Sequence, residues 1–210
     1  MIEIFKILLI FPIFLIFIFV PFPIFDKVNN KLNTEFLNFN LIINCNILLV
    51  LSLINLKIQD YQLFLFILYI SLFSYHLIKS KAKFLIIRND LSILFFSFFI
   101  FGCVIASKLD LGWDAKYFYY IKSLFFYDGL YISDLSQFEH NKWHPHFGSY
   151  FWAFFWSIPF FDIEYFGRLF YLFIFFFSIY FITFGLNKIL LIIRILFFSL
   201  LLIIFNFERF

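Results

Sequence analysis

Long uninterrupted runs of apolar residues, joined by mostly short polar connections, make up this chain. A helix needs about 20 mainly apolar residues to cross the hydrocarbon layer of a bilayer, and several of the runs approach that length. The runs do not alternate as barrel strands do, and backbone groups in lipid must pair internally, so we expect helices. The predicted spans are residues 4–25, 39–57, 63–78, 91–107, 148–161, 166–186 and 189–205, of which 148–161 is short enough to be tilted or partly interfacial.

Composition strengthens this interpretation. Apolar residues make up 64% of the chain and charged residues only 14%, against about 45–50% and about 25% in soluble domains. We therefore predict an all-α, polytopic transmembrane bundle of six or seven spans, located in a bacterial cytoplasmic membrane with the lipid bilayer as its first partner. The net charge of +3 comes without a basic recognition motif, which argues against nucleic acid. Cys45 and Cys103 lie inside apolar runs and read as small buried hydrophobes.

One polar interval divides the chain into three parts. We expect transmembrane helices over 1–107, a loop over 108–147 and further transmembrane helices over 148–210. The basic segment that includes Lys79, Lys81 and Lys83 is expected on the cytoplasmic side, which puts the loop on the outer face and Asp162–Arg168 back inside. Three spans before Lys79 would leave the N-terminus outside, unless one of the first three runs does not span.

The first half of the loop predicts an amphipathic helix at the membrane interface. No Pro or Gly occurs from Asp114 to Tyr127, and Gly129 stands where such a helix would end. One face, at spacings of three and four, carries Trp113, Tyr117, Tyr120, Ile121, Leu124 and Phe125. Asp114 falls in the first turn, where the helix dipole favours a carboxylate, so capping is its simplest role.

The second half of the loop gathers cations where the chain returns to the membrane. Lys142, His144 and His146 precede Gly148, at a depth where a lipid phosphate would lie. His140, His144 and His146 are also candidate ligands for a divalent cation. A His-x-His pair with Pro between does not match a helical ligand pair, so we interpret these residues mainly as polar anchors.

The order of the motifs resembles the first outer loop and following helix of GT-C fold glycosyltransferases. The similarity is to the protein mannosyltransferase and aminoarabinose transferase branch, which uses polyprenyl-phosphate sugars. It rests, in chain order, on Asp114, Tyr117, the stretch 128–131, the stretch 144–148, Tyr150, Trp152, Ala153 and the stretch 164–169. The family carries more helices beyond this point, so the resemblance implies an N-terminal portion of such an enzyme.

The resemblance also implies roles for individual residues. Asp114 would be the general base that takes the acceptor's hydroxyl proton, with Asp110 and Asp128 as alternatives. Lys142, His144 and His146 would contact the donor phosphate, and Lys116 and Tyr117 would complete the substrate site. Glu164 and Arg168 would form a structural i to i+4 pair.

Three functions are weighed on this basis. The first is a hexosyl or pentosyl transferase that moves a sugar from a polyprenyl-phosphate donor to a glycan, lipid or protein acceptor. The second is another envelope-polysaccharide protein, such as a polymerase, ligase or flippase, which would depend on basic loop residues. The third is a non-enzymatic membrane subunit or a transporter fragment, although few ionisable residues interrupt the spans.

Overall fold

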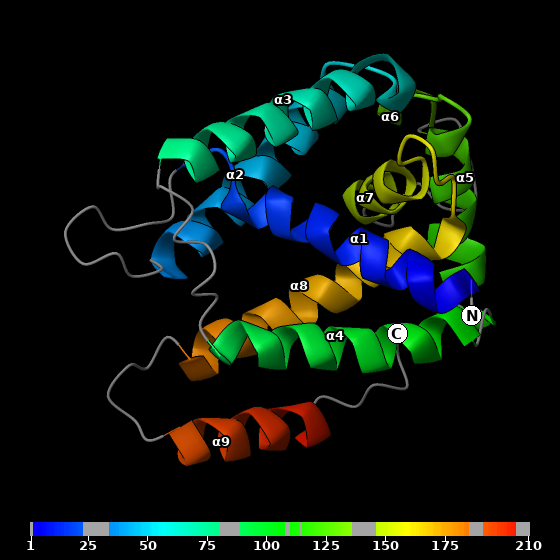
Figure 1. The fold of residues 1–210 in the computed structure, drawn as a ribbon. Coiled ribbons are helices and arrows are strands. Elements are labelled where there is room, and N and C mark those ends of the chain that lie inside the picture. Colours follow the sequence, from blue (N-terminus) through cyan, green and yellow to red (C-terminus); the bar gives the residue numbers. More distant parts are fainter. Residues whose placement is uncertain are drawn as a thin grey trace.

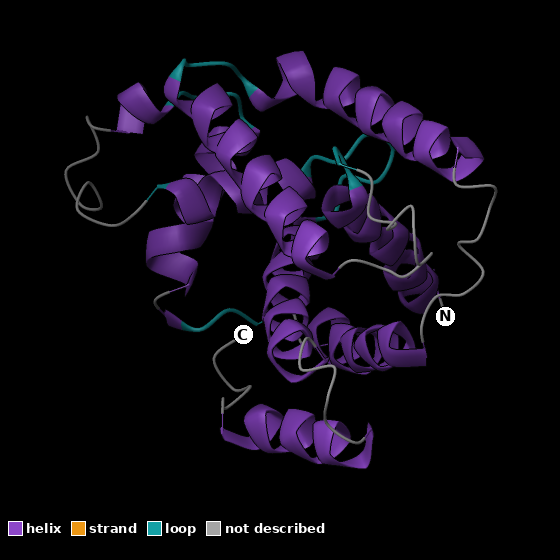
Figure 2. Ribbon diagram, turned by 90° about the vertical axis from the view of Figure 1, so that its left-hand side faces the viewer, coloured by secondary structure: helices purple, strands orange, loops and turns teal. Residues whose placement is uncertain are grey.

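The computed structural model describes residues 2–22, 34–79, 89–107, 110–113, 115–135, 146–184 and 191–204. Every regular element within these ranges is a helix (Figures 1 and 2). The elements are α1 (Ile2–Phe19), α2 (Thr34–Leu53), α3 (Ile58–Lys79), α4 (Asn89–Ser107), the π-helix η2 (Ala115–Tyr120), α5 (Ile121–Tyr127), α6 (Ile132–Leu135), α7 (Phe147–Trp156), α8 (Glu164–Phe184) and α9 (Leu191–Ile204). The all-α prediction is confirmed for this part of the chain.

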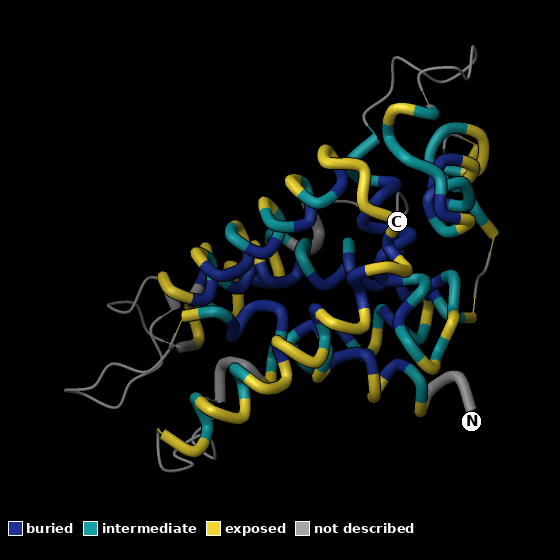
Figure 3. Tube along the Cα trace, turned by 90° about the horizontal axis from the view of Figure 1, so that it is seen from above, coloured by how far each residue is buried: buried dark blue, intermediate teal, exposed yellow. Residues whose placement is uncertain are grey.

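Three of the described helices are long and apolar enough to cross a membrane, namely α2, α3 and α8. Shorter apolar helices cover Phe5–Phe19, Ser92–Ser107 and Ile192–Leu201. Their outward surfaces are apolar as well, as at Phe64 on α3 and Ile192 on α9, which are 69% and 72% exposed (Figure 3). Exposed apolar surface on this scale is rare in water-soluble monomers, so these helices fit an integral membrane protein.

The long helices run alternately toward and away from one end of the bundle. η2, α5, α6 and α7 gather at this end, which we call the loop end (Figure 1). A Cβ atom on Gly102, late in α4, would lie 3.2 Å from Ile7 and 3.4 Å from Leu169, so early α1 and early α8 meet late α4. The N-terminal end of α1 therefore lies at the loop end. Three described helices, α1 to α3, precede Lys79.

Aromatic rings fill the centre of the bundle. Phe14 of α1 packs against Phe98 of α4, Phe155 of α7 and Phe170 of α8, with ring centroids 5.8, 5.2 and 5.5 Å away. Edge-on and tilted arrangements dominate these contacts, as the ring quadrupole favours. The phenylalanine-rich sequence thus supplies a core that joins four helices.

Asparagine side chains from α2 hold the buried end of α1. The last carbonyls of a helix have no partner within it, and α1 ends inside the bundle. Asn40 Nδ2 donates to Ile18 O at 3.2 Å and Asn44 Nδ2 donates to Val20 O at 2.7 Å. Tyr69 of α3 donates to Asn44 Oδ1 at 2.6 Å. These amides therefore link α1, α2 and α3, and they supply hydrogen bonds to the carbonyl groups at the end of α1.

The prediction of a spanning helix over 148–161 is wrong. α7 has 10 residues, about 15 Å of helix, whereas a span needs about 20 residues. The chain turns at 157–163 and α8 starts beside α7, where Trp152 donates to Glu164. Arg168 therefore lies at the loop end of the bundle, not at the opposite end as predicted. The physical reason is that α7 packs across the end of the bundle instead of crossing it.

Candidate functional site

The site is built where η2 and α5 pack on α7. Tyr120 and Tyr127 stack on Trp156 with centroids 5.7 and 4.6 Å away, and Phe126 meets Tyr150 edge-on at 5.2 Å. η2 is a six-residue π-helix, a rare conformation that occurs often at functional sites. These aromatic contacts hold η2 and α5, which together we call the loop helix, against α7.

The two sides of this loop helix carry an unusual distribution of residues. Trp113, Tyr117 and Ile121 of the predicted face form an exposed stripe, whereas Tyr120, Leu124 and Phe125 of that face are half-buried. Lys122 and Ser123, by contrast, are buried. Because bonds in a π-helix close from i to i+5, residues after it are rotated relative to a continuous α-helix. Lys122, Ser123 and Phe126 form the buried side of α5, opposite the exposed stripe.

Lys122 and His146 are the basic groups of this interior. Lys122 is 3% exposed, and burial lowers the pKa of its amine. Burial and the nearby Lys122 charge lower the pKa of the His146 imidazole. His146 Nδ1 is buried and makes no hydrogen bond to the part of the chain that the structure describes. Since His146 is the N-cap residue of α7, the positive end of that helix dipole adds to the same region.

An aromatic cleft lies beside these groups. It has a volume of about 250 Å³ and is lined by Tyr119, Gly148, Trp152 and Tyr171. The Tyr171 hydroxyl donates to Gly148 O. Ser123 and Ser149 both donate to Tyr119 O, at 2.8 and 3.0 Å. These bonds hold η2, α5, α7 and α8 around one opening with an apolar lining.

Polar contacts between α7 and α8 hold Trp152, one of the residues that line the cleft. Glu164 Oε1 lies 3.6 Å from Arg168 Nε, which is the predicted i to i+4 pair. Trp152 Nε1 donates to the same carboxylate oxygen at 3.0 Å. Since Trp152 also lines the cleft, the pair orients one of its walls.

The predicted site residues divide into three groups. Lys116 and Tyr117 are exposed on the outer side of the loop helix, and Asp110 and Asp128 are exposed too. Among the residues predicted to contact the donor phosphate, only His146 lies within the described part of the chain, and its Nδ1 is buried. Asp114, His140, Lys142 and His144 lie outside the described residues.

Sequence reasoning missed Lys122. The signal that could have found it is a lone lysine in an aromatic run. Within the described ranges, no three His, Cys, Asp or Glu side chains gather as a metal site would require. No family model, curated protein or solved structure matches the chain.

Proposed function

We propose that this chain is a membrane glycosyltransferase of the GT-C type, or the N-terminal portion of one, acting on a polyprenyl-phosphate sugar. The observation that carries the proposal is that the buried Lys122 and the partly buried His146, at the N-terminus of α7, lie beside an aromatic cleft. The pair lies at the end of an apolar bundle. A lipid-linked donor needs that combination, because its tail stays in hydrocarbon while its phosphate reaches a polar end.

The proposed chemistry follows from the charge that develops on the leaving phosphate. As the sugar's anomeric carbon separates from the phosphate oxygen, Lys122 and the α7 dipole stabilise the negative charge. Asp114, carried over from the family resemblance, takes the proton of the acceptor hydroxyl as that oxygen bonds to the anomeric carbon. The aromatic cleft receives the sugar or the first isoprene units.

The surroundings of the reaction are proposed from the same geometry. The exposed stripe of Trp113, Tyr117 and Ile121 lies at the headgroup level, as amphipathic aromatics do. In the proposed orientation the loop end faces outward from a cytoplasmic membrane. The acceptor, whether glycan, lipid or protein, approaches from that side.

The test is sugar transfer in membranes supplied with labelled polyprenyl-phosphate sugars. Lys122→Met keeps the length of the stem and removes the charge, so we expect transfer to fall on the order of 100-fold or more, as for loss of one charge-stabilising group. Lys79→Met is the matched control, because Lys79 is exposed in the last turn of α3 and has no place in the proposed site. Asp114→Asn tests the base, with loss of transfer expected.

A second candidate is favoured by the same lysine. A polymerase or ligase of envelope polysaccharide would depend on basic loop residues and not on Asp114. Transfer that survives Asp114→Asn but not Lys122→Met would favour that function. Equal transfer by the native chain and Lys122→Met would contradict the proposed phosphate contact.

A further inference from the structure

α2 carries two contrasting faces. The inward face is buried and comprises Leu37, Leu41, Asn44, Leu48 and Ser52. The outward face recurs at spacings of four, three, four and three residues, at Phe39, Ile43, Asn46, Val50 and Leu53. Phe39, Val50 and Leu53 are 50%, 55% and 61% exposed. Apolar residues at alternating spacings of three and four form the seam of paired helices, and we call these five residues the α2 seam.

A polar residue stands at the centre of this seam. Asn46 is exposed, although it lies in the middle of the candidate membrane span Glu35–Leu53. Its Nδ2 donates to Ile42 O at 2.8 Å. Within the described residues this is the bond that its amide makes, and hydrocarbon offers no acceptor or donor for the rest. Asn46 therefore favours a protein neighbour at that depth.

The opposite face of α2 shows how this chain uses such an amide. Asn44, two residues earlier, bonds to the carbonyls of Phe17 and Val20 and to the Tyr69 hydroxyl. Both the Nδ2 and the Oδ1 of Asn44 therefore make hydrogen bonds to other helices or to the chain that follows α1. Asn46 presents the same chemistry outward.

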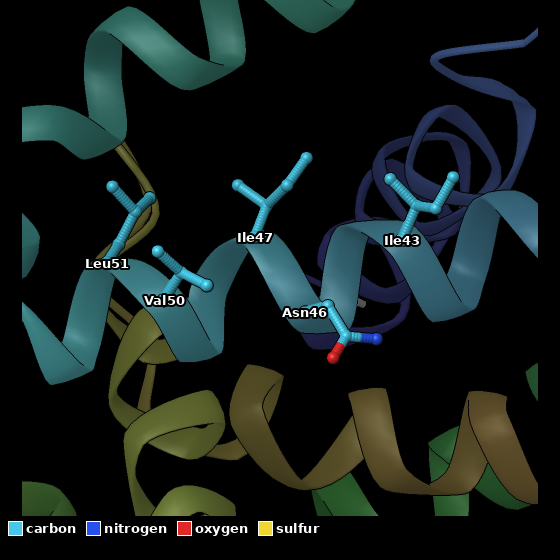
Figure 4. Close-up of a pocket in the computed structure, with 5 residues that line it drawn as sticks. All are labelled: Ile43, Asn46, Ile47, Val50 and Leu51. Carbon is cyan, nitrogen blue, oxygen red and sulfur yellow. The ribbon is translucent and has the colours of Figure 1, made fainter.

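The surface of α2 around Asn46 is hollowed. A hollow of about 340 Å³ runs along α2, lined by Ile43, Asn46, Ile47, Val50 and Leu51 (Figure 4). Ile43, Ile47 and Leu51 are separated by four residues each and form one ridge. Ridges of this kind interdigitate with those of a second helix, and packing replaces hydrophobic force in lipid.

We propose that the α2 seam is the interface with a second copy of this chain, paired about Asn46. Two copies insert in the same orientation, so their α2 helices are parallel and both Asn46 residues lie at one depth. A carboxamide is donor and acceptor at once, so two can bond reciprocally across a two-fold axis. An interhelical amide pair at a single seam position also fixes the register.

The experiment measures association of the full chain in lipid vesicles by energy transfer between labelled copies at increasing dilution in lipid. The native chain is expected to dimerise. Asn46→Leu should weaken association about 3- to 30-fold, the range for an interhelical hydrogen bond in a membrane. Asn46→Gln keeps an amide and should retain most of the association. Since Asn46 is exposed, Asn46→Leu leaves the core contacts of α2 intact.

Cysteine cross-linking then locates the interface. With Cys45 and Cys103 replaced by Ala, Val50→Cys and Leu53→Cys should cross-link between copies. Phe64→Cys, on the outward face of α3 and 69% exposed, is the matched control and should not. The proposal is overturned by a native chain that stays monomeric, by equal association of Asn46→Leu, or by cross-linking at Phe64 in place of Val50.

Discussion

At the residue scale, the loop end carries two basic side chains, of which the sequence pointed to His146 but not to Lys122. Lys122 is buried within an aromatic helix, and His146 precedes α7 with a buried Nδ1. Burying a cation is unfavourable unless something nearby compensates it. Lys122 and His146 place two basic groups at the polar end of the bundle, where the proposed function puts the donor phosphate.

The lowered pKa of His146 makes a prediction about pH. Because the folded chain disfavours the imidazolium, the unfolded chain binds the proton more readily. This contribution to stability is fully present above the unfolded pKa of about 6.5 and is lost as the pH falls through the lower pKa of the folded state. Unfolding midpoints in detergent should fall more steeply below about pH 6.5 for the native chain than for His146→Gln. Identical slopes would contradict the burial of this imidazole.

At the element scale, α7 and α8 approach so closely that one position tolerates only glycine. A Cβ atom on Gly167 would overlap the carbonyl oxygen and ring Cδ1 of Trp152 and lie 2.9 Å from its Cα. Two of these atoms belong to backbone, which cannot move aside as a flexible side chain can. The close contact lets Trp152 reach both Glu164 and the cleft.

Gly167→Ala should therefore destabilise the chain by about 1–3 kcal/mol, as overpacking does in a tight contact. Gly112→Ala is the matched control, because a Cβ there would meet nothing within 4 Å. Its effect should stay within about 0.5 kcal/mol. Free energies of unfolding measured in detergent by tryptophan fluorescence would check both. If both variants unfold alike, α7 and α8 do not meet at this glycine.

At the scale of the whole molecule, the alternating helices assign each loop to one end. The turns after α5 and after α7 share the loop end, whereas α2 starts at the other end beside the buried end of α1. The hydrogen bond between Tyr127 and Asp162, which raises the pKa of the Tyr127 phenol, joins these two turns. The bundle thus presents one aromatic, polar end.

This arrangement makes a prediction about sidedness. Cysteines introduced at the exposed positions Asp128 and Asp162 should react with a membrane-impermeant maleimide from the same side of sealed vesicles. A cysteine at Glu35 should react from the opposite side. The native chain is the blank, since Cys45 and Cys103 lie within apolar helices. Labelling of Asp162→Cys from the Glu35 side would show that α7 crosses the membrane after all.

The sequence by itself determined the class of this protein. Runs of Phe, Ile and Leu can only be buried in lipid or in an aromatic core, so helices and their approximate limits followed from hydropathy. The i to i+4 pair of Glu164 and Arg168 followed from helical spacing. These features could be predicted because each depends on residues within a single helix: its run of apolar residues, or two side chains one turn apart.

Tertiary structure decided the course of α7 and the inward direction of Lys122. A run of 14 residues fits either a tilted span or a short helix across the end of a bundle, and only packing against α5 and α8 selects the second. Packing of α5 on α7 decided which side of α5 faces the interior, and with it the burial of Lys122. Both outcomes depend on contacts between distant segments, which is why hydropathy alone could not supply them.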